Sequence, residues 1–348
     1  MHSSSIYEKI CSCNHVFIIA EAGVNHNGSL DTAKKMIDVA KSAGCDAVKF
    51  QSFKAEKVIS QQASLAPYQQ TSGINASSQL EMVKRLEFSE AEHIELMNYC
   101  SKQDILFLSS VFDEDSVDML QRLGVKVFKI PSGEITNIPL LCHIACKRRP
   151  ILLSTGMSTL NEIAEAVNAI SLCGNNEIVL LHCVSAYPAP IEEVNLKAMN
   201  TLKERFSLPV GFSDHTEGIV ASVAAVALGA QVIEKHFTLD KNMEGPDHKA
   251  SLEPEELRHM VEVLRLIEKA IGDGEKKLCP CEKENVMLVR KSVVAVKDIA
   301  KGQIFSKENI TLKRPGYGIQ PSDMKKIIGC TAKVDIKADE IVTWEKVL

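Results

Sequence analysis

The sequence predicts a (β/α)8 barrel, also called a TIM barrel, joined to a small and mostly β domain. Eight short apolar runs are separated by helical stretches, and polar or charged residues follow the carboxyl end of each run. The chain has 348 residues, and since a barrel needs about 250, one further small domain fits. Active sites of such barrels lie at the carboxyl ends of the strands, so the residues just past each run are the candidate functional residues.

Each apolar run is predicted to form one strand of the barrel. The first helix is expected over residues 29–43, with Asn27 or Ser29 as its cap and Gly44 just past its end. The predicted strands are residues 16–21, 47–51, 105–109, 127–130, 151–154, 178–182, 210–212 and 232–235. The other predicted helices are residues 113–123, 138–147, 159–172, 196–205, 218–228 and 253–271.

Residues 54–87 interrupt this alternation. The segment is rich in Gln and Ser and is longer than an ordinary connection between elements. Because it follows the second strand on the active-site side, it is a candidate lid or substrate loop. The alternative interpretation is an excursion of the chain that has no role in the site.

The carboxyl-terminal part of the chain has a different character. Residues 272–284 carry Gly, Lys and Pro without apolar periodicity, which is typical of a linker. Short β-like runs at 292–296, 331–334 and 340–344 then alternate with turn residues. The sequence therefore predicts a catalytic barrel over 1–272, a linker over 273–289 and a small β domain over 290–348.

Composition narrows the class of protein. The formal net charge is −5 and no Lys/Arg stripe is present, which argues against nucleic acid as a partner. No apolar stretch approaches the roughly 20 residues that span a bilayer, and residues 1–14 lack the core of a signal peptide. We therefore expect a cytoplasmic protein without a membrane partner. The eleven cysteines suit a reducing compartment, and the spacing of the two C-x-C pairs, at 11–13 and 279–281, is closer than structural zinc prefers.

Two histidines are the candidate metal ligands. His215 and His236 follow the last two strands, which are neighbours in a closed barrel, so their imidazoles can converge. With a carboxylate from Asp214, Glu234 or Asp247 they can hold one divalent cation and leave positions open for water and substrate. His182 is a candidate third contributor, although its apolar neighbours favour a role in the core.

Two lysines and four serines form a second candidate group. Ammonium groups and short hydroxyl donors around a barrel mouth suit a phosphate or carboxylate ligand, because each anionic oxygen needs a donor once water is excluded. The alternative is that each lysine lies in solvent at the end of its strand. The residues are Lys49, Ser110, Lys129, Ser132, Ser154 and Ser213.

Two carboxylates complete the candidate chemistry. Glu21 ends the first strand, and Glu134 follows the fourth. A carboxylate near a cation and a phosphate can act as a general base towards water. Either carboxylate can equally be an ion-pair partner of Lys49 or Lys129. The residues alone thus predict a metal-assisted enzyme that acts on a phosphorylated, carboxylated small molecule, without specifying the reaction.

Seven motifs at these strand ends resemble the sialic acid synthase family. They are AEAGVNHNG (20–28), VKFQ (48–51), KIPSGE (129–134), LSTGM (153–157), GFSDHT (211–216), EKHFT (234–238) and GPDH (245–248). The tail resembles the antifreeze-like domain, a SAF or β-clip domain, that ends these synthases, in RKS (290–292) and KRPGYG (313–318). The resemblance covers essentially the whole chain.

The resemblance implies an N-acetylneuraminate synthase, which condenses phosphoenolpyruvate with N-acetylmannosamine and water and releases phosphate. It implies a divalent metal on His215 and His236, with Mn2+ first and Mg2+ or Co2+ as alternatives, that polarises the sugar aldehyde. The six lysine and serine residues above match positions that bind phosphoenolpyruvate. Glu21 matches the carboxylate that manages the attacking water or its proton.

The resemblance also implies a sugar site and an oligomer. Gln51, Glu134, Tyr187 and Asp247 match contacts to the N-acetylated hexosamine. Arg314 matches an arginine that reaches the sugar's N-acetyl group in the partner barrel, which implies a domain-swapped homodimer.

One position departs from the pattern of the family. Many members that accept N-acetylmannosamine carry Asn between the His-Cys after the sixth strand and the following Tyr-Pro, whereas this chain has Ser185. The alternative is therefore a legionaminic acid synthase that uses 2,4-diacetamido-2,4,6-trideoxymannose. Synthases of 3-deoxy sugar acids lack the tail, and a binding protein without activity would not need both histidines, both lysines and both glutamates.

Overall fold

The computed structural model describes residues 5–11, 15–63 and 78–348. The chain divides into two compact units, Met1–Gly272 and Asp273–Leu348. Each unit has its own apolar core.

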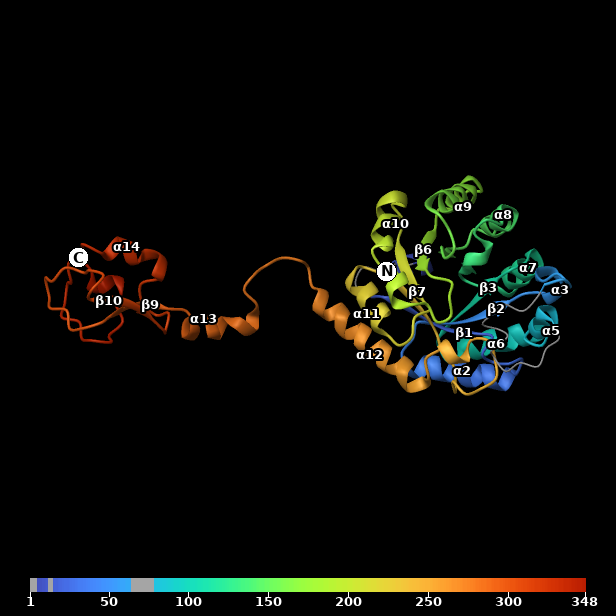
Figure 1. The fold of residues 1–348 in the computed structure, drawn as a ribbon, viewed down its shortest axis with the longest axis horizontal. Coiled ribbons are helices and arrows are strands. Elements are labelled where there is room, and N and C mark those ends of the chain that lie inside the picture. The colour runs from blue at the N-terminus through green and yellow to red at the C-terminus, as the bar shows by residue number, and fades with distance from the viewer. Residues whose placement is uncertain (1–4, 12–14, 64–77) are drawn as a thin grey trace. The chain divides into compact units, whose positions relative to one another are not determined.

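The first unit contains a closed barrel of eight parallel strands in sequential order, with β1 paired to β8 (Figure 1). The predicted TIM barrel is confirmed. Its strands are β1 Phe17–Gly23, β2 Ala47–Ser52, β3 Leu106–Val111, β4 Phe128–Ile130, β5 Ile151–Ser154, β6 Ile178–Cys183, β7 Val210–Asp214 and β8 Val232–His236.

Several strands continue past the predicted apolar runs. Ser110, Asp214 and His236 all belong to strands, although each is polar. Each is also buried. An apolar criterion ends a strand too early wherever its last residues are buried polar groups.

Helices surround the barrel, and most match the predicted ranges. The prediction missed α6 Glu90–Lys102, in which charged residues lie beside apolar ones and weaken the pattern. The capping box formed by Ser89 and Glu92 marks its start. The other barrel helices are α2 Leu30–Ser42, α7 Glu114–Leu123, α8 Ile138–Ala145, α9 Leu160–Leu172, α10 Ala198–Phe206, α11 Val220–Ala227 and α12 Pro254–Ile271.

The inside of the barrel is filled in two chemically different layers. The amino-terminal half is apolar, with Ile19, Leu108 and Leu152 packed together and Ile10 of α1 Ile6–Ile10 covering that end. Side chains of a strand return to the same face every two residues. The next inward layer is polar: Ile19 is followed by Glu21, Ala47 by Lys49, Leu108 by Ser110, Val127 by Lys129, Leu152 by Ser154, Leu181 by Cys183 and Val232 by Glu234.

The predicted lid segment lies beside the mouth of the barrel where it is described. Its described parts include α3 Ala55–Val58 and α5 Gln79–Lys84. Val24, Phe53, Ala55 and Leu86 form a small apolar cluster there. Residues 64–77 of the predicted segment lie outside the described residues.

The second unit is a small β domain. Strands β9 Ser292–Ala295 and β10 Ile310–Lys313 form an antiparallel pair. The predicted runs at 331–334 and 340–344 form isolated bridges rather than strands, and β10 was not predicted. The predicted linker contains a short helix, α13 Lys283–Val289. Within the described residues, no helix combines the length and the apolar character needed to span a membrane.

Candidate active site

A pocket of about 390 Å3 opens at the carboxyl ends of the barrel strands. Strand ends or the loops directly after them contribute to it from all eight strands. The two histidines predicted to bind the metal, the six residues predicted to bind phosphoenolpyruvate and the predicted catalytic Glu21 all line this pocket. They are Glu21, Lys49, Ser110, Lys129, Ser132, Ser154, Ser213, His215 and His236.

Four buried charged groups form the floor of the pocket. The Lys49 ammonium lies 2.7 Å from Glu21 Oε2 and 3.7 Å from Glu234 Oε2. The Lys129 ammonium lies 3.2 Å from Glu234 Oε1. We call Glu21, Lys49, Lys129 and Glu234 the charge quartet; with all four ionised its net charge is zero. Ion pairs this deeply buried stay in place only when both partners are present.

The two carboxyl groups of the charge quartet differ in acidity. Burial raises the pKa of Glu21 to about 7, against the opposing effect of Lys49. Burial would also raise the pKa of Glu234, but Lys129 and Lys49 together hold it at about 2. Glu234 is therefore a permanent anion at neutral pH, whereas Glu21 can exchange a proton there.

The serine hydroxyls surround the charge quartet. Ser110 Oγ accepts a hydrogen bond from Lys49 Nζ at 2.8 Å, and Ser213 Oγ donates to Glu234 Oε1 at 3.0 Å. Ser132 Oγ accepts from the Gly156 backbone N–H at 2.9 Å. Ser154 Oγ is buried and has no hydrogen-bond partner among the described residues. These hydroxyls and the two ammonium groups supply the donors that a multiply charged anion needs.

His215 and His236 lie with their ring centroids 5.4 Å apart. The Nδ1 of His215 is 2.7 Å from the Val184 carbonyl oxygen. A carbonyl only accepts, so Nδ1 carries a proton, and in the neutral ring Nε2 has a lone pair for a ligand. The Nδ1 of His236 is buried, makes no hydrogen bond to a described residue and lies 3.9 Å from Asp247 Oδ2.

The donor set of this pair fits a divalent first-row metal. Burial, His215 and Lys49 lower the pKa of His236 well below its usual value, so its imidazole is neutral and can ligate. Across residues 5–11, 15–63 and 78–348, no group of three or more His, Cys, Asp or Glu side chains is arranged to hold a metal ion. The two imidazoles would therefore be the main protein ligands, with positions left for water and substrate.

Three of the five candidate sugar contacts line the pocket. Gln51, Tyr187 and Asp247 line the pocket, and the Tyr187 ring centroid lies 4.2 Å from that of His215. Glu134 does not line the pocket, because its Oε2 accepts a hydrogen bond from Asn137 in a 3-10 turn. Arg314 belongs to the second unit, just after β10.

Of the other three candidate residues near the metal, Glu234 lies in the pocket, whereas Asp214 and His182 lie outside it. Glu234 was considered only as a possible metal neighbour, but it joins the charge quartet; its position two residues after the inward-facing Val232 was the available signal. Asp214 points away from the pocket and pairs with Lys235 at 3.2 Å, so it is not near the proposed cation. The Nε2 of His182 donates to the Val194 carbonyl at 2.7 Å, which leaves His182 outside the pocket, as expected for a core residue.

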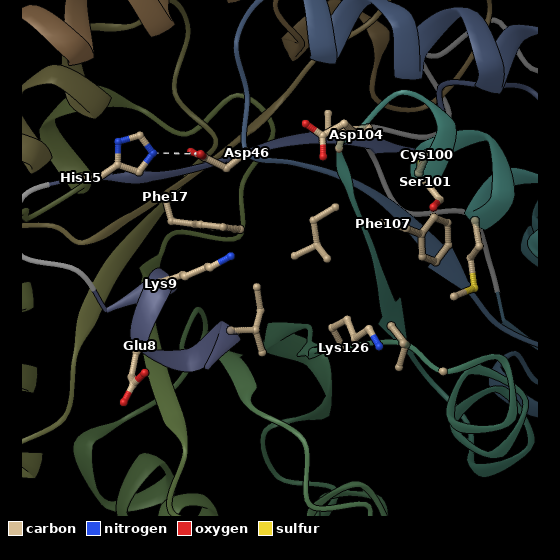
Figure 2. Close-up of a pocket in the computed structure, with 16 residues that line it drawn as sticks. Glu8, Lys9, His15, Phe17, Asp46, Cys100, Ser101, Asp104, Phe107 and Lys126 are labelled. Atoms are coloured by element: carbon tan, nitrogen blue, oxygen red, sulfur yellow. Dashed lines mark hydrogen bonds and ion pairs between the residues drawn. The ribbon is translucent and has the colours of Figure 1, made fainter. Parts of the chain in front are cut away.

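A larger cavity, of about 770 Å3, lies at the amino-terminal end of the barrel (Figure 2). Lys9 and Lys126 are part of its lining, and at its edge His15 Nε2 lies 2.9 Å from Asp46 Oδ1 (Figure 2). None of the predicted site residues lines this cavity. The chemistry is therefore assigned to the pocket at the carboxyl ends of the strands.

Known proteins match the chain over most of its length. Residues 36–276 match the NeuB family, and residues 290–348 match the SAF domain. The N,N'-diacetyllegionaminic acid synthase of Campylobacter jejuni is 56% identical over 329 residues, covering 93% of this chain and 98% of the relative. The N,N'-diacetyllegionaminic acid synthase of Legionella pneumophila is 48% identical over 335 residues, covering 95% and 94%.

A solved structure agrees with these matches. The N-acetylneuraminic acid (sialic acid) synthetase of Leptospira borgpetersenii aligns with a TM-score of 0.71 at 37% identity, covering 79% of this chain and 91% of that chain. The resemblance predicted from the strand-end motifs is confirmed: the chain belongs to the NeuB family of nonulosonic acid synthases and carries a SAF domain at residues 290–348.

Proposed function

We propose that this protein condenses phosphoenolpyruvate with an open-chain, N-acetylated hexosamine and water, giving a nine-carbon α-keto acid and phosphate. One observation carries the proposal. The charge quartet and its ring of serine hydroxyls lie in the same pocket as two converging histidines. That arrangement offers an anion site and an aldehyde-activating site side by side, which a condensation of this kind requires.

The phosphoenolpyruvate site is proposed to comprise Lys49, Ser110, Lys129, Ser132, Ser154 and Ser213. The two ammonium groups attract the phosphate and carboxylate of the substrate, and the hydroxyls donate to individual oxygens. The buried Ser154 hydroxyl supports this assignment because it lacks a described partner. A buried hydroxyl normally has one, and an anionic ligand would supply it.

His215 and His236 are proposed to hold a divalent cation, with Mn2+ first and Mg2+ or Co2+ as alternatives. When bound, the cation supplies Lewis-acid polarisation of the sugar aldehyde. The protonated Nδ1 of His215 fixes its ring against the Val184 carbonyl. The Tyr187 ring lies tilted against that of His215 and limits how the aldehyde end of the sugar can enter.

Glu21 is proposed to manage the proton of the water. The C2=C3 π electrons of phosphoenolpyruvate form a bond from C3 to the aldehyde carbon, whose oxygen takes up the C=O π electrons and a proton to become a hydroxyl. Water adds at the electron-poor C2, and the tetrahedral intermediate loses phosphate by C–O cleavage as its C2 hydroxyl gives its proton to the phosphate and becomes the keto group. Water addition releases one proton, and a carboxylate with a pKa of about 7 can accept it at neutral pH. Glu234 remains ionised and holds both ammonium groups towards the substrate.

The acceptor sugar is proposed to be 2,4-diacetamido-2,4,6-trideoxymannose, which would make the product legionaminic acid. Two relatives at 56% and 48% identity are named N,N'-diacetyllegionaminic acid synthases, and Ser185 replaces the Asn typical of enzymes that accept N-acetylmannosamine. N-acetylmannosamine is the second candidate, supported by the Leptospira synthetase at 37% identity. This order reverses the one that the motifs alone suggested.

The SAF domain is proposed to complete the sugar site of a partner subunit. Arg314 would donate to the N-acetyl group of the sugar in the barrel of the second chain, in a domain-swapped homodimer. The resemblance of the KRPGYG motif to the family supports this role.

The experiment that tests the function is phosphate release from phosphoenolpyruvate in the presence of Mn2+. The two sugars are offered separately, and His236→Ala serves as the variant without activity. A higher kcat/KM for the diacetamido sugar supports a legionaminic acid synthase. A higher value for N-acetylmannosamine supports a sialic acid synthase, and release with neither sugar would refute the proposed reaction.

A further inference from the structure

One side of the active-site pocket is apolar. Six side chains form what we call the apolar wall: Val24, Phe53, Met82, Val83, Leu86 and Phe112. Val24, Phe53 and Leu86 pack in one cluster, with Val83 and Phe112 against it. The Phe53 and Phe112 rings meet edge to face, with centroids 6.0 Å apart. The wall is thus a packed surface and not a set of separate exposed residues.

The apolar wall starts beside β8, because β1 pairs with β8, and runs round the barrel mouth to the sector opposite β7. Val24, Phe53 and Phe112 follow β1, β2 and β3, and the remaining wall residues come from α5 and the residue stretch after it. His215 directly follows β7, and His236 is the last residue of β8. The barrel is closed with its strands in sequential order, so β3 lies across the mouth from β7.

The charged side chains that line the pocket come from strand residues below the wall or from the sector of His236. Glu21, Lys49, Lys129 and Glu234 form the floor, and Asp247 lies beside His236. A sugar whose aldehyde is held at the histidines, above the floor, extends its far carbons across the mouth. Those carbons then meet the side chains of the wall.

A hydroxyl group at that far end would lose its water without gaining a partner from the wall side chains. A methyl group would instead replace water with apolar contacts. A single methylene in an apolar pocket discriminates between substrates by about 10- to 200-fold. The wall therefore favours an acceptor whose terminal carbon carries no oxygen.

We infer that the apolar wall selects acceptor sugars that are deoxygenated at C6. This inference rests on the proposed function, and it names Val83 and Phe112 as residues that determine specificity. Both are only partly buried, so each retains surface that faces the pocket.

The test uses a pair of acceptors that differ by one oxygen: N-acetylmannosamine and its 6-deoxy form. The kcat/KM of each is measured with saturating phosphoenolpyruvate and Mn2+ for the full-length protein. We expect the wild-type protein to prefer the 6-deoxy sugar by about 10-fold or more. Val83→Thr, which exchanges a methyl for a hydroxyl at nearly constant shape, should reduce that preference about 3- to 10-fold, mainly through the KM of the sugar.

Two further variants make the result decisive. Phe112→Tyr adds a hydroxyl to the same wall and should reduce the preference in the same direction. Val223→Thr is the matched control, because Val223 packs in α11 on the outside of the barrel and does not line the pocket. The KM of phosphoenolpyruvate should stay unchanged in all three variants, which checks that the pocket floor is intact.

The outcomes separate this inference from the proposed function. If the wild-type protein releases phosphate with neither these two sugars nor the diacetamido sugar, the proposed function itself fails. If it turns over sugars but shows no preference for the 6-deoxy form, the inference is wrong. It is also wrong if the preference exists and neither wall variant changes it.

Discussion

At the scale of single residues, the period of the strands explains which candidates come together. Glu21, Lys49 and Lys129 each lie two residues beyond an apolar residue of the barrel interior, so all three point into the mouth. Glu234 also lies two residues beyond an apolar interior residue, Val232. The sequence analysis considered it only as a metal ligand, because it is close in sequence to His236. Glu134 belongs to the 3-10 turn after β4, which is not periodic in this way, and it does not line the pocket.

The charge quartet predicts opposite effects of Glu234→Gln on stability and on anion binding. Removing one carboxylate leaves Lys49 and Lys129 with only Glu21 as a partner, which should lower the free energy of unfolding by about 3 kcal/mol. The same change leaves excess positive charge, so phosphoenolpyruvate should raise the melting temperature more than it does in the wild-type protein. Thermal unfolding with and without phosphoenolpyruvate measures both effects.

A matched variant controls for the removal of a carboxylate. Glu134→Gln removes a half-buried carboxylate that does not line the pocket, and we expect a change within about 0.5 kcal/mol. Equal effects of the two substitutions would contradict the cooperative role assigned to the charge quartet.

The pKa of Glu21 predicts the acidic side of the pH profile. Its carboxyl group has a raised pKa of about 7, so the fraction that can accept a proton rises as the pH increases through 7 and falls below it. We therefore expect kcat to fall about tenfold for each pH unit below that value. Glu21→Gln should lower kcat by about 100-fold or more and remove this pH dependence. If kcat of the variant still falls below pH 7 as it does in the wild-type protein, the fall is caused by the titration of another group.

At the scale of the elements, the ends of β7 and β8 are joined by a buried ion pair. Asp214 and Lys235 are adjacent in the strand register, and their side chains are fully buried 3.2 Å apart. Asp214 also accepts hydrogen bonds from Thr216 and Ser222. Because His215 and His236 are the next residues along each strand, the pair fixes the backbone from which both imidazoles project.

This pair predicts strong coupling in a double-mutant cycle. Lys235→Met leaves an unpaired buried carboxylate and should cost about 3–5 kcal/mol in the free energy of unfolding. Asp214→Asn combined with Lys235→Met should cost less than the sum of the two single changes. Urea unfolding of the four proteins gives the coupling energy. Additive costs would show that the two side chains do not act as a pair.

The strands were predicted from sequence more completely than the helices and the tail. All eight strands were predicted because continuous apolar runs are typical of strands buried on both faces. The helix α6 was missed because its apolar residues contrast weakly with their neighbours. In the tail, β10 carries Thr and Lys on a half-exposed edge, and the predicted runs at 331–334 and 340–344 pair through single bridges. Such pairing depends on contacts between distant residues and has no local signal.

At the scale of the whole molecule, the chain holds two units with separate cores. The charge quartet and the two histidines belong to the first unit, whereas Arg314 belongs to the second. If Arg314 serves the sugar, its effect should be confined to that substrate. We therefore expect Arg314→Ala to raise the KM of the sugar about 10-fold or more and to leave the KM of phosphoenolpyruvate unchanged.

Complementation between two inactive or weakly active variants tests whether Arg314 acts on the partner barrel. In a domain-swapped homodimer, a chain with Arg314→Ala still has an intact barrel, and a chain with His236→Ala still has an intact Arg314. Exchange of subunits should create one complete site in each mixed dimer, which restores roughly a quarter of the wild-type activity at an equal ratio of the two chains. If Arg314 instead serves its own barrel, both sites of every mixed dimer stay defective and no activity returns. The concentration dependence of the restored activity then distinguishes subunit exchange from contamination, because only exchange requires dimers to dissociate and reform.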